Sequence, residues 1–375
     1  MESFRQYLAV SERNRTCIWG RGVAGGRRVG ALHQAARPLA VTCPDGLASG
    51  AAAPYRKSTM KKLDSRSVVV LARDRDDFDL KVLSSMLGSR GIELQIADPL
   101  DLAIQCEGPE IRMWNNDSPV RPGLVIGWRS GGAALHAIKQ LDAIEQAGID
   151  VLNSAVVLLR GLSPFLKSVT LQTNSVPHYP IISGKAPSGV MSMADRVGYP
   201  MVARPLMTRD LDANAAVRGQ DIVFEDASTL KEFVTGKAAS GHFYMQLRPP
   251  RTGQRLRVFC VNHHPVACLP DVPDERQSDP LAILSEPAAH VAGLASRAIG
   301  GHPSMVEISE DRPGSRNWRV EDVTVCPGPD PDLSRSGLHE TVMRAQARFL
   351  AARLEEGPAA RGGRRSWSAA HDSWA

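Results

Sequence analysis

The segments SMVEIS (304–309) and WRVEDVTV (318–325) decide the fold of this 375-residue chain. Both are short runs rich in the apolar and β-branched residues that strands favour, and the turn sequence RPGSRN separates them. We therefore expect a pair of antiparallel strands. On such a pair, Glu307 and Asp322 can face the same side of the sheet.

A cation site is one interpretation of these acids. With the hydroxyl of Thr324, Glu307 and Asp322 offer two carboxylates and a neutral oxygen, which suit a small hard cation such as Mg²⁺. The alternative is that they are solvated carboxylates on an exposed sheet face, because acids on hairpin strands are common. The three residues alone leave both interpretations open.

The first part of the chain alternates between strand and helix patterns. SVVVLA (67–72) is a continuous β-branched run, as in a strand buried inside a parallel sheet. In the helical segment 134–148, the apolar face is expected to comprise Leu135, Ile138, Leu141 and Ile144. The expected order is strand 67–72, helix 76–91, strands 92–98 and 124–128, helix 134–148 and strand 149–154. This alternation predicts a small doubly wound sheet.

The second part has a different pattern, with longer spacing between shorter strands. A helix, a break near Pro164 and a second helix open it, and a closing helix ends at Gly357. Between them we expect strands at 179–184, 199–206, 221–225, 242–249, 256–262 and 265–270, and a helix at 285–301. We expect these regions: a leader over 1–65, a first domain over 66–153, a second domain over 154–355 whose subdomains divide near residue 240, and a disordered tail over 356–375.

The basic charge of the chain is concentrated in its leader. The formal net charge is +5, but residues 1–65 contribute +7 and residues 66–375 contribute −2. A nucleic-acid function based on the overall charge is therefore not supported. The leader composition fits a transit peptide, a disordered tail, or a mis-called start, since Met60, Lys61 and Lys62 come shortly before the first strand and would be an ordinary beginning.

Other global features point to a cytosolic protein. The six cysteines are widely spaced and include no CxxC, which fits reduced thiols rather than a disulfide framework or a zinc site. The mean hydropathy is −0.20. No apolar run approaches the roughly 18 residues of a membrane span.

Four segments in order resemble the ATP-grasp superfamily, specifically the RimK-type glutamate ligases close to glutathione synthetase. They are GIDVLNSAVVLLRGLSPFLKSVTLQ (148–172), VGYPMVARPL (197–206), FYMQLRPPRTGQRLRVFCVNHHPVAC (243–268) and WRVEDVTVCPGPD (318–330). The resemblance extends over about 66–352. It implies an α/β fold in which the small doubly wound sheet is the pre-ATP-grasp domain and two α+β subdomains clasp nucleotide between them.

The resemblance also implies roles for individual residues. Glu307, Asp322 and Thr324 match the positions that bind metal in the family. Arg257 matches an arginine whose fork suits phosphate or carboxylate oxygens. The backbone of the hinge would pair with the adenine edge. The implied nucleotide-binding residues are Arg204, Met245, Gln246, Leu247, Arg248 and Arg257, and the implied catalytic residues are Arg204 and Arg257.

The chain also departs from the family pattern. The first nucleotide lysine of the family falls at Pro164, with Lys167 nearby, and the second falls at Arg204. The hinge glutamate is Leu247. The phosphate loop should be rich in glycine, but the corresponding segment 207–222 contains only Gly219.

Two hypotheses follow from the resemblance. In the first, the chain is a ligase: ATP with Mg²⁺, or Mn²⁺ as an alternative ion, phosphorylates a carboxylate, and an amine attacks the acyl phosphate to form an amide. The substrates would be small molecules or peptides, with glutamate as the family's example. Neither a membrane nor a nucleic acid is an expected partner, and a homo-oligomer is compatible with the sequence. In the second, a catalytically impaired ATP-grasp domain acts as a binding or assembly module. The retained acids and Arg257 favour the ligase.

Two further positions have competing interpretations. His263 and His264 are adjacent turn residues, and we expect both to be exposed rather than to form a metal pair. Trp128 and Arg129 lie at the carboxyl end of an expected parallel strand, where ligands bind in doubly wound folds. Arg129, with Ser130 and Gly131, could contact substrate, or Trp128 could simply be packed beside a surface arginine.

Overall fold

The computed structural model describes most of the compact unit Met60–Ala375. The described residues are 66–107, 110–129, 134–184, 186–203, 222–237, 243–247, 253–270, 281, 283–328 and 330–356. The predictions made for the leader, for the tail beyond residue 356, and for Arg204, Arg248, Ser130 and Gly131 lie outside these ranges. Within them, no helix is both long and apolar enough to cross a membrane.

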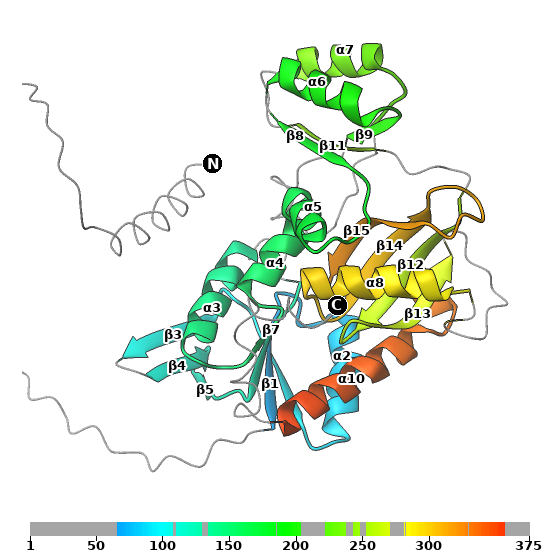
Figure 1. Cartoon of the computed structure of the whole chain (residues 1–375). Coiled ribbons are helices and arrows are strands. Elements are labelled where there is room, and N and C mark those ends of the chain that lie inside the picture. The colour runs from blue at the N-terminus through cyan, green and yellow to red at the C-terminus, as the bar shows by residue number, and fades with distance from the viewer. Residues whose placement is uncertain are drawn as a thin grey trace, which may run out of the picture. The chain divides into compact units, whose positions relative to one another are not determined.

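The predicted parallel sheet is present, with strand order β2-β1-β6-β7. Its strands and flanking helices are β1 (Ser67–Leu71), α2 (Phe78–Gly88), β2 (Glu93–Ala97), β6 (Leu124–Gly127), α3 (Ala134–Gln146) and β7 (Val151–Leu152). All five residues of β1 are buried, which explains its uninterrupted apolar sequence. Alternate β1 side chains pack against α2 on one face and against α3 on the other, so helices cover both faces of this sheet (Figure 1).

Two details of this region differ from the sequence-based expectation. Residues between β2 and β6 form a separate antiparallel sheet, made of β3 (Leu102–Glu107), β4 (Glu110–Asn115) and β5 (Ser118–Val120). Leu135 is 46% exposed and does not belong to the apolar face of α3. The buried stripe of α3 instead passes through Ala134, Ala137, Ile138, Leu141 and Ile144, and Leu135 lies out of phase with it.

The break predicted near Pro164 separates two helices, α4 (Ala155–Leu162) and α5 (Pro164–Thr173). The side chain of Ser163 caps α5, and Pro164 occupies its first turn, where a missing N–H costs nothing. A second sheet with order β10-β9-β11-β8 follows, with its own apolar core. Its elements are β8 (Ile181–Gly184), α6 (Pro187–Val197), β9 (Met201–Ala203), β10 (Ile222–Phe224), α7 (Ala227–Lys237) and β11 (Phe243–Leu247).

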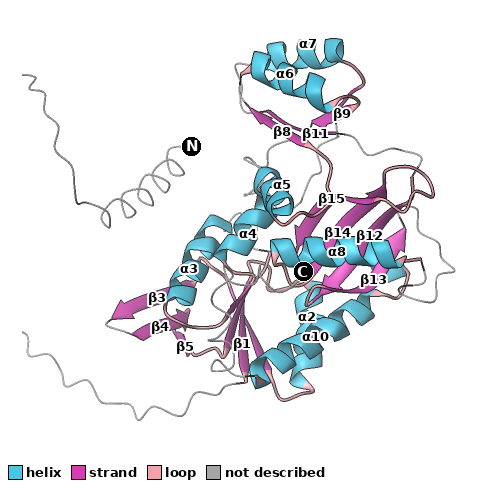
Figure 2. Cartoon of the chain, in the orientation of Figure 1, coloured by secondary structure: helices cyan, strands magenta, loops and turns pink. Residues whose placement is uncertain are grey.

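The third sheet contains the predicted hairpin and has the antiparallel order β13-β12-β14-β15 (Figure 2). Its elements are β12 (Arg255–Val261), β13 (His264–Pro270), α8 (Glu286–Ile299), β14 (Ser304–Glu310), β15 (Trp318–Val325), α9 (Pro331–Arg335) and α10 (His339–Glu355). Helix α8 packs on one face of this sheet, and α9 and α10 pack on the other. Helix α10 also packs against α2, so it joins this sheet to the parallel one. The short helix α9 was not expected from the sequence.

Candidate functional site

Four of the predicted site residues share one face of the third sheet. Arg257 on β12 pairs in register with Glu307 on β14, and Glu307 pairs with Asp322 on β15. Thr324 lies two residues after Asp322 and pairs with Met305, so it belongs to the same face. All four are half-buried, although most of their neighbours on these strands are fully buried. The sheet therefore presents a polar stripe across three adjacent strands.

A β-bulge sets the phase of this stripe. The pairing shifts after Glu307: Asp322 lies opposite Glu307, but Val320 lies opposite Ile308, so Glu321 is an extra residue. Val320 consequently packs in the core on the α8 face, although two-residue alternation would place it with Asp322. The spacing of Val320 and Val323, two core residues three positions apart, was a signal of this shift in the sequence.

The bulge residue itself is held by an arginine. Arg255 donates to both carboxylate oxygens of Glu321, from Nε at 2.8 Å and from Nη2 at 2.6 Å. The Glu321 side chain is only 2% exposed. A bidentate arginine contact of this kind is a strong, geometrically specific hydrogen-bonded pair, and it holds the bulge that orients Asp322.

Asp322 forms an ion pair with Lys167, which comes from the first turns of α5. Asp322 Oδ1 accepts from Lys167 Nζ and also from the backbone N–H of Val323 at 2.8 Å. Lys167 donates in addition to the carbonyl of Val323 at 3.1 Å, and its side chain is 9% exposed. From the sequence, Lys167 was only a displaced neighbour of the position where the family has a nucleotide lysine, and its contact with a predicted metal ligand was not expected.

Arg257 is also engaged by acids. Its Nη1 donates to Asp330 Oδ2 at 2.5 Å, and its Nη2 donates to Asp332 Oδ2 at 2.6 Å. Asp330 caps α9 through its other oxygen, which accepts from the backbone N–H groups of Asp332 and Leu333. Neither aspartate was predicted as a site residue from the sequence. Their signal was the order Asp-Pro-Asp, an N-cap followed by a proline in the first turn.

The predicted adenine hinge lies beside this stripe. Gln246 is buried, and its Nε2 donates at 3.0 Å to the backbone carbonyl of Glu321. Met245 is fully buried in the core of the second sheet, and Leu247 is half-buried at the end of β11. The backbone N–H of Leu247 donates to the carbonyl of Pro180 at 2.9 Å. The hinge strand is thus attached to the residue that precedes Asp322.

The oxygen donors of the stripe suit one hard cation. Across the described residues, no group of three or more His, Cys, Asp or Glu side chains is arranged to hold a metal. Glu307 and Asp322 face each other in register, and the Thr324 hydroxyl is a third oxygen on the same face. Mg²⁺ keeps several waters and commonly takes only one or two carboxylates, so two carboxylates and a hydroxyl are donors of the kind that this ion uses.

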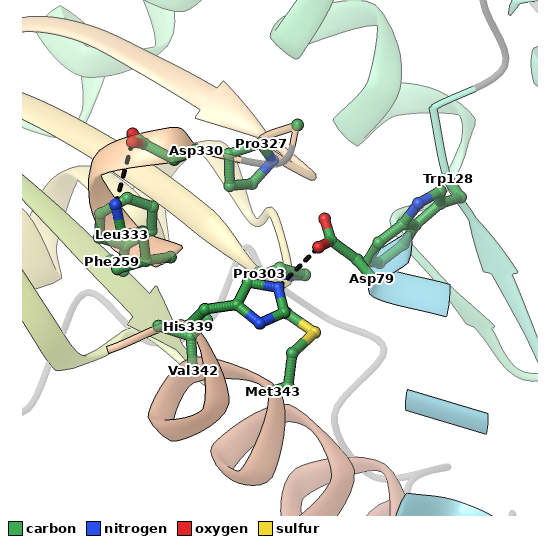
Figure 3. Close-up of a pocket in the computed structure, with 11 residues that line it drawn as sticks. Asp79, Trp128, Phe259, Pro303, Pro327, Asp330, Leu333, His339, Val342 and Met343 are labelled. Carbon is green, nitrogen blue, oxygen red and sulfur yellow. Dashed lines mark hydrogen bonds and ion pairs between the residues drawn. The ribbon is translucent and has the colours of Figure 1, made fainter. Parts of the chain in front are cut away.

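Trp128 and Arg129 belong to a buried polar network. Trp128 is 1% exposed, so the interpretation as a packed tryptophan is confirmed. Arg129 is not a simple surface arginine, because its Nη2 donates to Asp77 at 2.5 Å and to Asp79 at 3.0 Å. His339 Nε2 lies 2.7 Å from the other oxygen of Asp79, beside a small pocket that Trp128 also lines (Figure 3).

The two adjacent histidines have different environments. His264 is exposed as expected, but the expectation for His263 was wrong, because His263 folds back towards α8. Its Nδ1 lies 3.2 Å from Ser296 Oγ, and its ring centroid lies 4.4 Å from that of His302. Burial lowers the pKa of His263 to about 4 and that of His302 to about 3. The positive φ angles of Asn262 and His263 form the tight turn that directs the ring inward.

Asn153, in the segment 148–172 that resembles the family, is a buried side chain that joins distant parts of the backbone; we call this role a clamp. It has a left-handed φ of 54°. Its Nδ2 donates to the carbonyls of Gly127 at 3.0 Å and His302 at 2.7 Å, and its Oδ1 accepts from the backbone N–H of His302 at 2.7 Å. The neighbouring Cys326 is fully buried, and burial raises the pKa of its thiol, so it is not an activated nucleophile.

Comparisons with known proteins show similarity only at the level of structure. No family model matches the chain, and no curated protein matches it. A RimK domain ATP-grasp protein from Sphaerobacter thermophilus is 18% identical with a TM-score of 0.54, over 76% of this chain and 99% of that chain. The ATP-grasp ligase PsnB, complexed with minimal precursor, Mg and ADP, is 18% identical with a TM-score of 0.54, over 77% and 100%. The macrocyclase MdnC from Microcystis aeruginosa, bound with precursor peptide MdnA, is 10% identical with a TM-score of 0.57, over 76% and 99%.

Proposed function

We propose, since the chain has the ATP-grasp fold, that it is an ATP-dependent ligase that joins a carboxylate to an amine. The product is an amide or peptide bond of the kind that glutamate ligases form. A similar ligase and a similar macrocyclase are bound with precursor peptides, so a peptide is included among the candidate substrates.

The polar stripe of the third sheet is the observation that carries this proposal. Arg257, Glu307 and Asp322 lie side by side across three strands, next to the strand that contains Gln246. Such a stripe combines a guanidinium for anionic oxygens with carboxylates for a cation. A protein needs these two kinds of group to bind a nucleoside triphosphate together with its divalent ion.

Each part of the stripe has a separate role in the proposed reaction. Glu307, Asp322 and Thr324 hold Mg²⁺, which when bound neutralises phosphate charge. Arg257 stabilises the negative charge that develops as phosphate is transferred to the substrate carboxylate. Asp330 and Asp332 hold the two ends of the Arg257 guanidinium and fix its plane against the sheet. The hinge contacts the adenine edge where β11 ends at Leu247, since β8 and β9 pair with the backbone of Met245 and Gln246.

Nucleotide binding is the first experiment. Calorimetry on the full chain, with ATP in the presence and absence of Mg²⁺, should show micromolar binding that requires the ion. Glu307→Gln should weaken this binding at least tenfold, because it removes a carboxylate from the stripe. Glu340→Gln is the matched control, since Glu340 is exposed on α10 and pairs only with the surface residue Arg344.

A screen for ADP release then tests the reaction itself. Candidate carboxylates and amines, with glutamate and peptides ending in glutamate included, should stimulate ADP formation in pairs. An absence of ATP binding at millimolar concentration would contradict the ligase function.

The second candidate is a non-catalytic ATP-grasp module that binds a partner. Lys167 on Asp322, together with two aspartates on Arg257, favours it, because cationic and anionic groups of the chain already occupy the key side chains. A module of this kind would keep the fold but show neither ion-dependent ATP binding nor ADP release.

A further inference from the structure

We propose that Lys167 is a resident cation of the carboxylate pair, so that its ammonium takes the place of a divalent ion at Asp322. The site would then hold a single divalent ion. This inference rests on the proposed function, because it takes Glu307 and Asp322 as cation ligands. It goes further by assigning Lys167 to the cation side of the site rather than to the nucleotide phosphates.

The position of Lys167 is set by three contacts between the α4–α5 region and the edge strand β15. Gly161 lies against Val325, where a Cβ on the glycine would come within 3.0 Å of Val325 Cγ2. Further along, Lys167 contacts Asp322 and the carbonyl of Val323. Finally, Tyr179 N donates to the carbonyl of Val320 at 3.2 Å, and Val320 N donates to that of Pro177 at 2.9 Å.

These contacts follow β15 in order from Val325 to Val320, so Lys167 is held in the middle of a docked segment. Its ammonium has two acceptors on consecutive residues of the strand. A long side chain held at 9% exposure by two acceptors has little freedom to leave them. We therefore treat the Lys167 ammonium as a fixed component of the cation site.

The consequence is electrostatic. Asp322 Oδ1 already receives the ammonium and a backbone N–H, and the fixed positive charge repels a second cation nearby. Glu307 lies one strand further from the α5 docking edge than Asp322 and Thr324, since β14 lies inside β15 in the sheet order. We therefore place the single divalent ion towards Glu307, on the side of the stripe away from the ammonium.

Metal binding without nucleotide tests the proposal. Free Mn²⁺ is measured by electron paramagnetic resonance for the full wild-type chain, Lys167→Gln and Lys167→Arg. Glutamine removes the charge but keeps an N–H donor for Val323, whereas arginine keeps the charge. We expect Lys167→Gln to bind Mn²⁺ at least tenfold more tightly than wild type, and Lys167→Arg to stay within about threefold of wild type.

Several results would overturn it. Equal Mn²⁺ affinity in wild type and a folded Lys167→Gln variant would show that the ammonium does not compete with the ion. A loss of ATP affinity in that variant without a gain in Mn²⁺ affinity would assign Lys167 to the phosphates. If neither wild type nor Lys167→Gln bound Mn²⁺, both this inference and the cation site of the proposed function would be contradicted.

A measurement on the wild-type chain needs no folded variant. With the full chain in excess over ATP, so that nearly all of the nucleotide is protein-bound, Mn²⁺ titration should reach one tightly bound ion per nucleotide. Two tightly bound ions per nucleotide would overturn the proposal while leaving the ligase function intact.

Discussion

Gln246 Nε2 donates a 3.0 Å hydrogen bond to the backbone carbonyl of Glu321, the bulge residue that immediately precedes Asp322. The two residues are 75 positions apart in the chain. Through this bond, the strand predicted to contact adenine and the strand predicted to hold the metal are positioned by one another. The bulge residue Glu321 accepts hydrogen bonds from two other strands: its carbonyl accepts from Gln246 on β11, and its carboxylate accepts from Arg255 on β12.

Gln246→Leu should destabilise the protein by about 1–3 kcal/mol. Leucine has a similar volume but no donor, so the buried Glu321 carbonyl would lose its partner at this position. The free energy of unfolding in urea is the measurement. Gln146→Leu is the control, because Gln146 is exposed and bonds only with Asp142 on its own helix. A change in the free energy of unfolding of less than about 0.5 kcal/mol for Gln246→Leu would show that this hydrogen bond does not stabilise the fold.

Asn153→Ala should cost about 3 kcal/mol or more. Alanine removes four hydrogen bonds, to Gly127, Cys326 and His302, in a site where Asn153 is 2% exposed, and it also disfavours the left-handed backbone conformation. Denaturant unfolding measures the loss. Asn174→Ala, which removes an exposed bond at the end of α5, should change stability by less than about 1 kcal/mol. Similar losses for both variants would contradict the clamp role.

Arg129→Leu should destabilise the protein by about 3–5 kcal/mol, since it leaves Asp77 and Asp79 buried without their cation. The exposed ion pair of Arg344 with Glu340 provides the comparison. Arg344→Leu should change stability by at most about 1 kcal/mol, because exposed pairs contribute little. Thermal and urea unfolding should rank the two variants in this order, and the reverse order would refute the importance of the network.

Acid should destabilise the fold through His263 and His302. Both have a pKa lowered by burial, to about 4 and about 3, whereas an unfolded histidine titrates near 6.5. Above about pH 6.5 neither state binds the proton, so stability is intact. As the pH falls from 6.5 towards 4, only the unfolded chain binds it, and stability declines.

The melting temperature at pH 7.5, 6.0 and 5.0 follows this effect. His263→Gln should reduce the decline between pH 6.5 and 4, because one of the two depressed groups is gone. His264→Gln should leave the decline unchanged, since His264 is exposed. An identical pH profile for wild type and His263→Gln would contradict this account.

Local sequence patterns predicted the order of the elements and the face of the site. The uninterrupted apolar run of β1, the break at Pro164 where α5 begins, and the turn between β14 and β15 act over a few residues, and the structure confirms each of them. Glu307 and Asp322 are opposite each other because a hairpin brings its own two strands together. Resemblance to a family extended these patterns to Arg257 and Gln246.

Only the tertiary structure decided what those side chains contact. Lys167 meets Asp322 across 155 positions, and Arg257 meets Asp330 across 73. No local pattern encodes such pairs, because they depend on how α5 docks on β15 and on where α9 begins. The sequence by itself determined that Glu307 and Asp322 lie opposite each other, since hairpin pairing is local, whereas the bulge at Glu321 set the face of the remaining β15 residues. Packing between distant elements determined which charges neutralise that stripe.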